Sequence, residues 1–168
     1  MKILAVFCFI ICLFILAIAK VIASPEEDAI AKTIADSAKA MTDFPKTRDV
    51  RSVLRLYAKD YMGINNGESE TLMEVEKVLT DLEEKINLGK PVGIVDRVSN
   101  VKVQVTGTLG WATYDEVMKI GAGGEVLVDL QAKCTGIYKK KGMEWLVQHV
   151  HCSTPHMEKG NPPEESTE

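Results

Sequence analysis

Residues Glu144–Ser153 read EWLVQHVHCS and have the composition of a β-strand, rich in β-branched and aromatic residues. Side chains alternate along a strand with a period of two. One face is therefore expected to carry Trp145, Val147, His149, His151 and Ser153. Two of the three histidines of the chain then point the same way, toward either a cavity or an interface.

The same period of two extends upstream over residues 92–105, 107–120 and 125–139. Together with the closing segment these make four long antiparallel strands in sequence, a meander. The stretch GAGG at residues 121–124 joins two strands and opens no helix, so it is a hairpin loop and not a dinucleotide fingerprint. The alternation of side chains does not show which face of the strand over residues 107–120 is buried, the one with Trp111 and Asp115 or the one with Tyr114 and Glu116.

Three helices are predicted ahead of this sheet. The first runs from Pro25 and ends before Phe44, with apolar residues at steps of three and four. The second starts behind Thr47 as its N-cap and continues to Tyr61. The third follows from Ser69, although leucine stands where a capping box requires Glu or Gln.

Between the second and third helices, residues 61–64 predict a very short strand and residues 65–67 (NNG) a tight reversal. The expected fold is therefore α+β: a cone-shaped, curled antiparallel sheet of four long strands plus one short strand, packed on three N-terminal helices. Such a sheet leaves a pocket wherever the helices do not fill its concave side.

The N-terminus has the features of an export signal. Lys2 is followed by an uncharged apolar run over residues 3–19 and then by small residues, so residues 1–23 are predicted to be a cleaved signal peptide. The alternative is an uncleaved anchor formed by residues 3–19, because the run is nearly long enough to span a bilayer. Both readings place the domain, residues 25–155, outside the cytoplasm, in the periplasm or secreted.

Charge limits the partners of the exported domain. Removal of residues 1–23 takes away Lys2 and Lys20 and no acid, so the net charge moves from −4 to −6. An acidic domain argues against nucleic acid and against anionic membranes, which leaves membrane contact only through the N-terminal segment if it is not cleaved. The acidic, Pro-containing tail, residues 156–168, is predicted to be disordered.

Cys134 and Cys152 are the two cysteines that remain after cleavage. If the last turn is centred on Lys141 and Gly142, Cys134 opposes His149 and the two sulfurs lie on opposite faces. A bulge that shifts the register by one would bring both sulfurs to the same face, so the disulfide stays open at this point.

The sequence resembles the SnoaL-like branch of the nuclear transport factor 2-like superfamily in three places. These are the closing segment over residues 144–153, the stretch GWATYD at residues 110–115, and Tyr57, Asp60 and Tyr61 before Gly63. The resemblance covers residues 47–155. It implies a conical α+β barrel with an internal pocket, and commonly a homodimer built by packing sheets together. The superfamily contains isomerases, dehydratases, cyclases and kinase association domains, so the resemblance implies no particular reaction, and no catalytic residue is carried over.

The candidate ligand contacts are Tyr57, Asp60, Trp111, Asp115, His149 and His151. The histidines could bind a carboxylate or relay a proton near neutral pH, and Asp115 would be a candidate acid or base if its face is concave. The plain alternatives are interface histidines held by hydrogen bonds, a solvated Asp115 and a capping role for Asp60.

Other chemistry lacks a motif. A zinc site requires three or four ligands, and two histidines two positions apart supply only two, so no metal site and no cofactor are predicted. The chain has no nucleophile elbow, phosphate loop or HExxH motif.

The sequence therefore predicts an exported, homodimeric SnoaL-like protein that binds a small, largely apolar molecule in its cone. One alternative is a cofactor-independent isomerase or dehydratase with Asp115 or His149 as its base. The other is a dimeric interaction module whose cone is filled by its own side chains.

Overall fold

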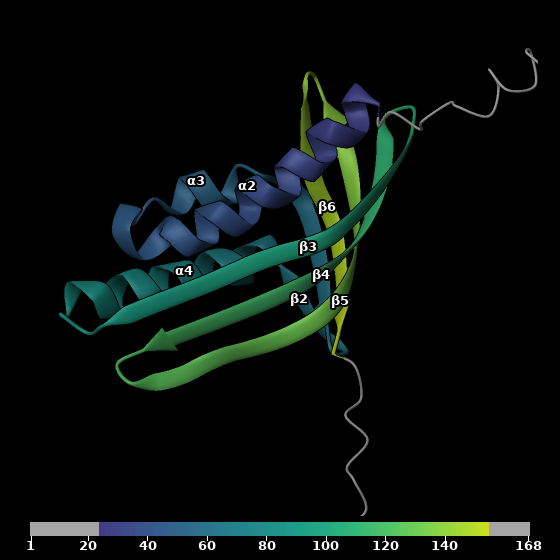
Figure 1. Ribbon diagram of the computed structural model, residues 1–168. Helices are drawn as coiled ribbons and strands as arrows, with labels where there is room; N and C mark the ends of the chain where they lie inside the picture. Colours follow the sequence, from purple (N-terminus) through teal and green to yellow (C-terminus); the bar gives the residue numbers. More distant parts are fainter. Residues whose placement is uncertain (1–23, 155–168) are drawn as a thin grey trace, which may run out of the picture.

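The computed structural model describes residues 24–154 (Figure 1). The signal peptide or anchor predicted over residues 1–23 and the disordered tail predicted over residues 156–168 lie outside the described residues. Within residues 24–154, no helix combines the length and the apolar character needed to cross a membrane.

The first helix, α2 (Pro25–Thr47), is longer than predicted. It was expected to end before Phe44, but it continues through Pro45 for another turn. Phe44 is completely buried, so the last turn is kept by packing against the core. The helix ends at Arg48, whose left-handed backbone lets its N–H donate to the carbonyl of Phe44 at 2.8 Å.

The second helix is much shorter than predicted. It covers only α3 (Val50–Leu54), and Tyr57 and Tyr61 belong to a strand, β1 (Tyr57–Asn65). A separation of four residues fits one face of a helix and also one face of a strand, so the tyrosines could not distinguish the two. Pairing with the closing strand decided the outcome, because β1 runs parallel to it and Val147 N–H donates to the carbonyl of Leu56 at 2.9 Å.

The predicted tight reversal is present and joins β1 to a second short strand, β2 (Glu68–Thr71). The third helix, α4 (Leu72–Asn87), therefore begins three residues later than the predicted start at Ser69. Thr71 caps it, and Glu74 completes a capping box by accepting from the Thr71 N–H at 2.6 Å.

The meander is confirmed in β3 (Val92–Thr106), β4 (Leu109–Ala122), β5 (Glu125–Lys141) and β6 (Glu144–Ser153). The sheet has six strands in the order β2-β1-β6-β5-β4-β3, against the five expected, and β1 adds a parallel pair to it. The expected α+β cone is confirmed: the sheet curls around the helices without closing (Figure 1).

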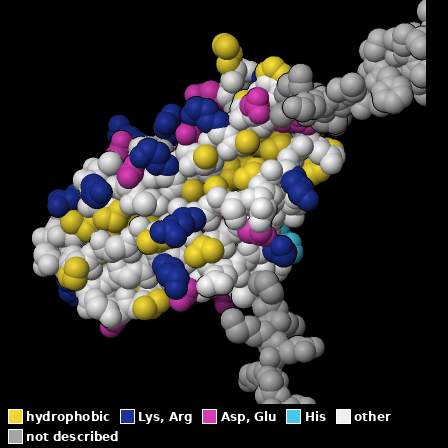
Figure 2. Space-filling model, viewed as in Figure 1, with side chains coloured by type: hydrophobic (Ala, Val, Ile, Leu, Met, Phe, Trp, Pro, Cys, Tyr) yellow, Lys and Arg dark blue, Asp and Glu magenta, His cyan; other side chains and the backbone are white. Residues whose placement is uncertain are grey.

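Two groups of buried residues fill the space between helices and sheet. In the first group, the first half of α2 packs against β4, β5 and β6 around Ile30, Tyr138 and Trp145. In the second group, the end of α2 packs with α4 around Phe44 and Leu79. On the surface, Figure 2 shows an apolar area where α2 meets β3, within a face that carries many lysine and arginine side chains.

A β-bulge in β6 changes which residues share a face. Tyr138 pairs with Val147 but Ile137 pairs with His149, so Gln148 is left between two pairs. Side chains before the bulge and after it therefore alternate out of phase. The prediction that Trp145, Val147, His149 and His151 lie on one face is wrong: the first two are buried in the cone and both histidines lie on the other side of the sheet.

The bulge also brings the two cysteines together. Cys134 and Cys152 are direct cross-strand partners with Cα atoms 4.2 Å apart, and their sulfurs form a disulfide. The bridge lies on the inner face, where both cysteines are buried. The bulge therefore settles the alternative that the sequence left open.

Candidate functional site

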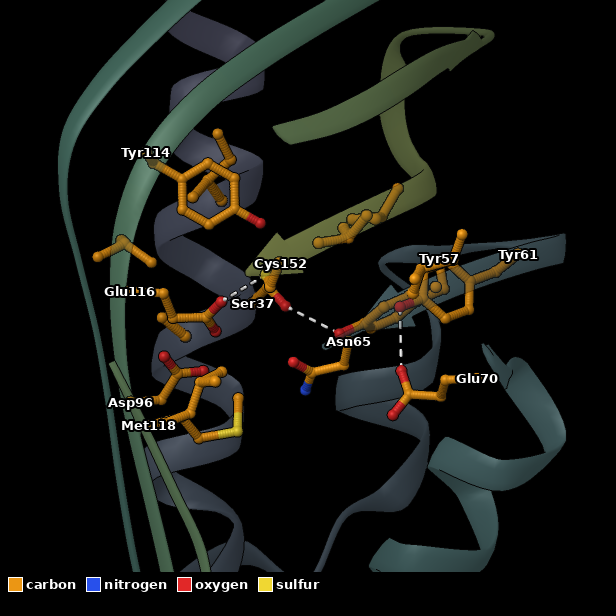
Figure 3. A pocket seen from close by; sticks show the side chains of 18 of the residues that line it. Ser37, Tyr57, Tyr61, Asn65, Glu70, Asp96, Tyr114, Glu116, Met118 and Cys152 are labelled. Carbon is orange, nitrogen blue, oxygen red and sulfur yellow. Dashed lines mark hydrogen bonds between the residues drawn. The ribbon is translucent and has the colours of Figure 1, made fainter. Parts of the chain in front are cut away.

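A cavity of about 130 Å³ lies inside the cone, between α2 and the concave face of the sheet. Side chains from α2 and from all six strands line it (Figure 3). The apolar part of the wall includes Ile34, Val98, Met118, Leu130 and Val150. The polar part consists of three carboxyl groups, four tyrosines, Ser37 and Asn65.

One wall carries a pair of acids, Asp96 on β3 and Glu116 on β4. The two strands are neighbours, and both side chains point into the cavity (Figure 3). Burial raises the pKa of both carboxyls, and the charge of Asp96 raises that of Glu116 further. The nearness of the two side chains raises the pKa of Glu116 and lowers that of Asp96, so Glu116 is the group that keeps its proton to higher pH.

Such a pair can act in both directions of a proton transfer. An ionised Asp96 is a base, and a protonated Glu116 beside it is an acid. The backbone of Asp96 is held in place by Thr42 of α2, whose hydroxyl donates to the Asp96 carbonyl at 3.2 Å and accepts from its N–H at 3.0 Å.

Glu116 also touches the disulfide. Its carboxyl oxygen lies 3.1 Å from Sγ of Cys134 and 3.5 Å from Sγ of Cys152. The two sulfurs and this carboxylate form a group with the ligand types of a metal site, all within 4.8 Å of one another. Sulfurs joined in a disulfide carry no proton to donate and offer no thiolate, so the group is not a metal site while the bridge is intact.

The opposite wall carries the third acid, Glu70 on β2. Tyr61 donates its hydroxyl proton to Glu70 Oε1 at 3.0 Å, and Tyr57 lies 3.4 Å from the Ser37 hydroxyl (Figure 3). Burial raises the pKa of Glu70, and the hydrogen bond from Tyr61 opposes this shift. Burial likewise raises the pKa of Tyr57 to about 12, so its hydroxyl keeps its proton at physiological pH.

Two further tyrosines, Tyr114 and Tyr138, complete the lining. Burial raises the pKa of both hydroxyls, so both tyrosines keep their protons at physiological pH. The Tyr138 ring crosses Gly136, where an added Cβ would lie 2.7 Å from the Tyr138 hydroxyl oxygen. Glycine at this position therefore allows the ring to lie against the strand.

Of the six predicted ligand contacts, the structure places Tyr57 in the cavity lining. Asp115 lies on the convex face, where hydrogen bonds from Asn100 at 2.6 Å and from Lys133 at 2.9 Å lower its pKa. Asp60 is exposed on β1, and its carbonyl accepts from the Gln148 side chain. As a catalytic candidate, Asp115 therefore has neither the burial nor the raised pKa that the prediction required.

Trp111, His149 and His151 also lie on the convex face. Trp111 pairs across the sheet with Ile137, which in turn pairs with His149, so these side chains form a row over β4, β5 and β6. The catalytic candidate His149 is therefore on the outside of the cone, as is His151. The bulge at Gln148 is the reason.

The sequence reasoning missed Glu70, Asp96 and Glu116 as site residues. Glu116 lies on the opposite face of its strand from Asp115, and alternation of side chains does not show which of the two faces is buried. A signal for Asp96 was present, because it stands between Ile94 and Val98 on a face of β3 that is otherwise apolar. Glu70 carried no signal, since the sequence predicts a helix that begins at Ser69.

Solved structures with the same fold include three bacterial proteins. An NTF2-like protein from Cytophaga hutchinsonii has a TM-score of 0.62 at 15% identity, over 78% of this chain and 99% of its own. An NTF2-like protein of unknown function from Pseudomonas putida has a TM-score of 0.56 at 21% identity, over 79% of this chain and 89% of its own. A candidate dehydratase of the NTF2-like family from Streptomyces avermitilis has a TM-score of 0.59 at 16% identity, over 76% of this chain and 94% of its own. At these identities the likeness shows the fold alone.

The sequence comparisons agree with the fold. No curated protein matches the sequence. The family model of the SnoaL-like domain matches residues 34–157, which is most of the chain and includes every strand that surrounds the cavity. The chain belongs to the SnoaL-like domain family, within the nuclear transport factor 2-like fold.

Proposed function

We propose that this protein binds a small organic molecule inside its cone. The observation that carries the proposal is the cavity of about 130 Å³, which is lined half by apolar and half by polar side chains. An engineered cavity of roughly 150 Å³ holds benzene, so a body of about six carbon atoms fits. The expected ligand has a largely apolar body and a polar group that meets the carboxyls.

Native mass spectrometry of the protein purified from its own host tests this proposal. A small molecule should be retained by the wild type and lost in Val98→Phe, because Val98 lines the cavity and the larger side chain would fill it. Val95→Phe is the matched control, since Val95 lies on the same strand and is exposed. An empty wild type, or equal retention by both variants, would contradict the proposal.

A second candidate function is a proton-transfer enzyme, an isomerase or a dehydratase without a cofactor. The Asp96–Glu116 pair favours it, because a base and an acid with raised pKa values face one cavity. These residues replace Asp115 and His149 as the proposed base and acid. A structural neighbour is a candidate dehydratase, which is compatible with this chemistry on the same fold.

Isotope exchange separates binding from this second function. The retained molecule, incubated with the protein in heavy water, should take up carbon-bound deuterium. Glu116→Gln and Asp96→Asn should each slow this exchange by roughly 10² or more, the usual contribution of general acid–base catalysis. Binding without any isotope exchange would support a binding site and would contradict the proposal of an enzyme.

The convex face supports the proposal of a homodimer. Trp111 and Ile137 are cross-strand partners there and are 41% and 40% exposed. Trp111→Arg should halve the mass measured by light scattering, whereas Met73→Arg, on the exposed side of α4, should not change it. A monomeric wild type would contradict the dimer, and a dimer with an empty cone would favour the interaction module.

Export from the cytoplasm remains the proposed localisation, with residues 1–23 as a cleaved signal or an anchor. The Cys134–Cys152 disulfide supports it, because such bonds persist in oxidising compartments. The intact mass of the protein from fractionated host cells is the test. A full-length protein in the cytosolic fraction would contradict it.

A further inference from the structure

Three acidic side chains line the cavity, and their charges have no cationic partner there among the described residues. Glu70, Asp96 and Glu116 reach it from three different strands, β2, β3 and β4. Among the described residues that line it, there is no lysine, arginine or histidine. Buried carboxyls in folded proteins are ordinarily paired with a cation or another strong donor. Here Asp96 and Glu116 face each other and the neutral disulfide, so no fixed positive charge of the described chain balances the cavity.

One polar atom in this wall lacks a partner. Oδ1 of Asp96 is fully buried and makes no hydrogen bond within the described chain. Tyr138, whose ring lines the same cavity, is 1% exposed. Buried polar groups are rarely left in this state unless a ligand or water completes them.

The aromatic lining is suited to a positive charge as well. Tyr57 and Tyr61 meet edge to face at 4.8 Å between ring centroids, and Tyr114 and Tyr138 line the other side of the cavity. A cation near the face of an aromatic ring is attracted by about 0.5–2 kcal/mol, and more strongly when it is desolvated. An anion near the same ring faces is repelled.

We infer that the cavity binds an organic cation, a protonated amine with a small apolar body, whose ammonium group lies between Asp96, Glu116 and the tyrosines. This inference rests on the proposed function and names the chemical class of the ligand. The apolar body would lie against Val98, Leu130 and Val150. The ammonium protons would supply the hydrogen bond that Asp96 Oδ1 lacks.

Binding of a cation has a measurable consequence, the release of a proton. The titratable groups that face the cavity are Glu70, Asp96, Glu116 and the tyrosines of β1, β4 and β5; α2 and β6 contribute none. An ammonium ion placed between Asp96 and Glu116 favours the ionised form of both, so the proton that Glu116 holds is released to solvent. A neutral ligand of the same shape releases none.

Cyclohexylammonium and cyclohexanol are a matched pair of probes, because they have the same number of heavy atoms and differ in charge. Each is titrated into the ¹⁵N-labelled full chain at pH 7, with the backbone amides of Asp96, Glu116 and Val150 as reporters. We expect the ammonium ion to bind at least tenfold more tightly than the alcohol. Calorimetry in two buffers of different ionisation enthalpy should show proton release with the ammonium ion only.

Two variants and a control attribute the effect. Asp96→Asn and Glu116→Gln should each remove most of the tenfold preference, and Glu116→Gln should also abolish the proton release. Glu125→Gln, at an exposed acid beside the β4–β5 turn, should change neither.

The outcomes separate this inference from the proposed function. If the alcohol binds in the cavity as tightly as the ammonium ion, or if the preference survives both variants, the cation inference is overturned and the binding pocket stands. If neither probe shifts the reporter amides and the protein from its host is empty, both proposals are overturned.

Discussion

Replacing Glu116 by glutamine is expected to stabilise the protein at neutral and alkaline pH. Burial and the neighbouring charge of Asp96 raise the pKa of Glu116 from 4.5 to about 8. The same carboxyl in the unfolded chain titrates at its ordinary pKa. Between these two pH values the folded protein keeps a proton that the unfolded chain has released, so stability falls as the pH rises through this window.

The size of the effect follows from the width of the window. Each unit between the unfolded pKa and the pH costs about 1.4 kcal/mol of unfolding free energy, so about 2.5 units at pH 7 give roughly 3 kcal/mol. The side chain is only half-buried in the cavity wall, and screening there reduces the figure to about 2 kcal/mol. The amide of glutamine has nearly the same shape, can still donate to Asp96 and carries no such cost. Below about pH 4.5 the carboxyl is protonated in both states, and the two proteins should be equally stable.

Urea unfolding followed by circular dichroism at pH 4.5, 7 and 8.5 measures the difference. The wild type should lose stability over this range, and Glu116→Gln should lose markedly less. Glu125→Gln changes the net charge equally at an exposed position and should follow the wild type. A Glu116→Gln protein that is less stable than the wild type at pH 8.5, or that has the same pH slope, would refute the argument.

Three further predictions concern the frame of the cavity. Reduction of the Cys134–Cys152 bridge, which closes a loop of 18 residues, should cost about 3 kcal/mol and lower the melting temperature by roughly 10 °C, whereas Cys134→Ser/Cys152→Ser should melt at one temperature with or without reductant. Gly136→Ala should cost about 1–3 kcal/mol in urea unfolding, because its Cβ would lie 2.7 Å from the Tyr138 hydroxyl, and an unchanged midpoint would show that the ring moves freely. Thr71→Ala removes the cap of α4 and should cost about 1 kcal/mol in thermal unfolding, with Thr71→Ser restoring most of it.

The stability that Glu116 is expected to cost supports the proposed function. A glutamine would serve the fold better at neutral pH, yet the chain carries carboxyls at Glu70, Asp96 and Glu116 around one cavity. Groups whose pKa values are shifted by burial and by each other gather at sites of binding and catalysis. Proteins tolerate such unfavourable groups where they are needed for activity.

Local pattern was enough to predict most of the fold. The period of two over residues 92–153 identified the meander, because alternation over long strands has few other interpretations. It failed between residues 54 and 71, where Tyr57 and Tyr61 fit a helix and a strand equally well. Partner strands decided that segment: β1 lies between β6 and β2, and these contacts are far apart in the sequence.

The candidate site depended even more on distant contacts. Alternation along β4 shows that Asp115 and Glu116 point in opposite directions, but it does not show which direction is inward. That choice was made by α2, which covers one face of the sheet and leaves the other exposed. In β6 one unpaired residue, Gln148, reverses the alternation, and it moves the histidines out of the cone while bringing Cys152 to Cys134.

The sequence alone thus determined the four-stranded meander and the presence of helices ahead of it, because these follow from periodicity and turn residues that act over short distances. The family was indicated by resemblance and not by these local patterns. Only the tertiary structure decided which side chains meet in the cavity. A strand has two equivalent faces until a helix covers one of them, and a single bulge exchanges those faces without leaving a local signal. For that reason the acid and base proposed for function are Asp96 and Glu116, inside the cone, and not His149 and Asp115, outside it.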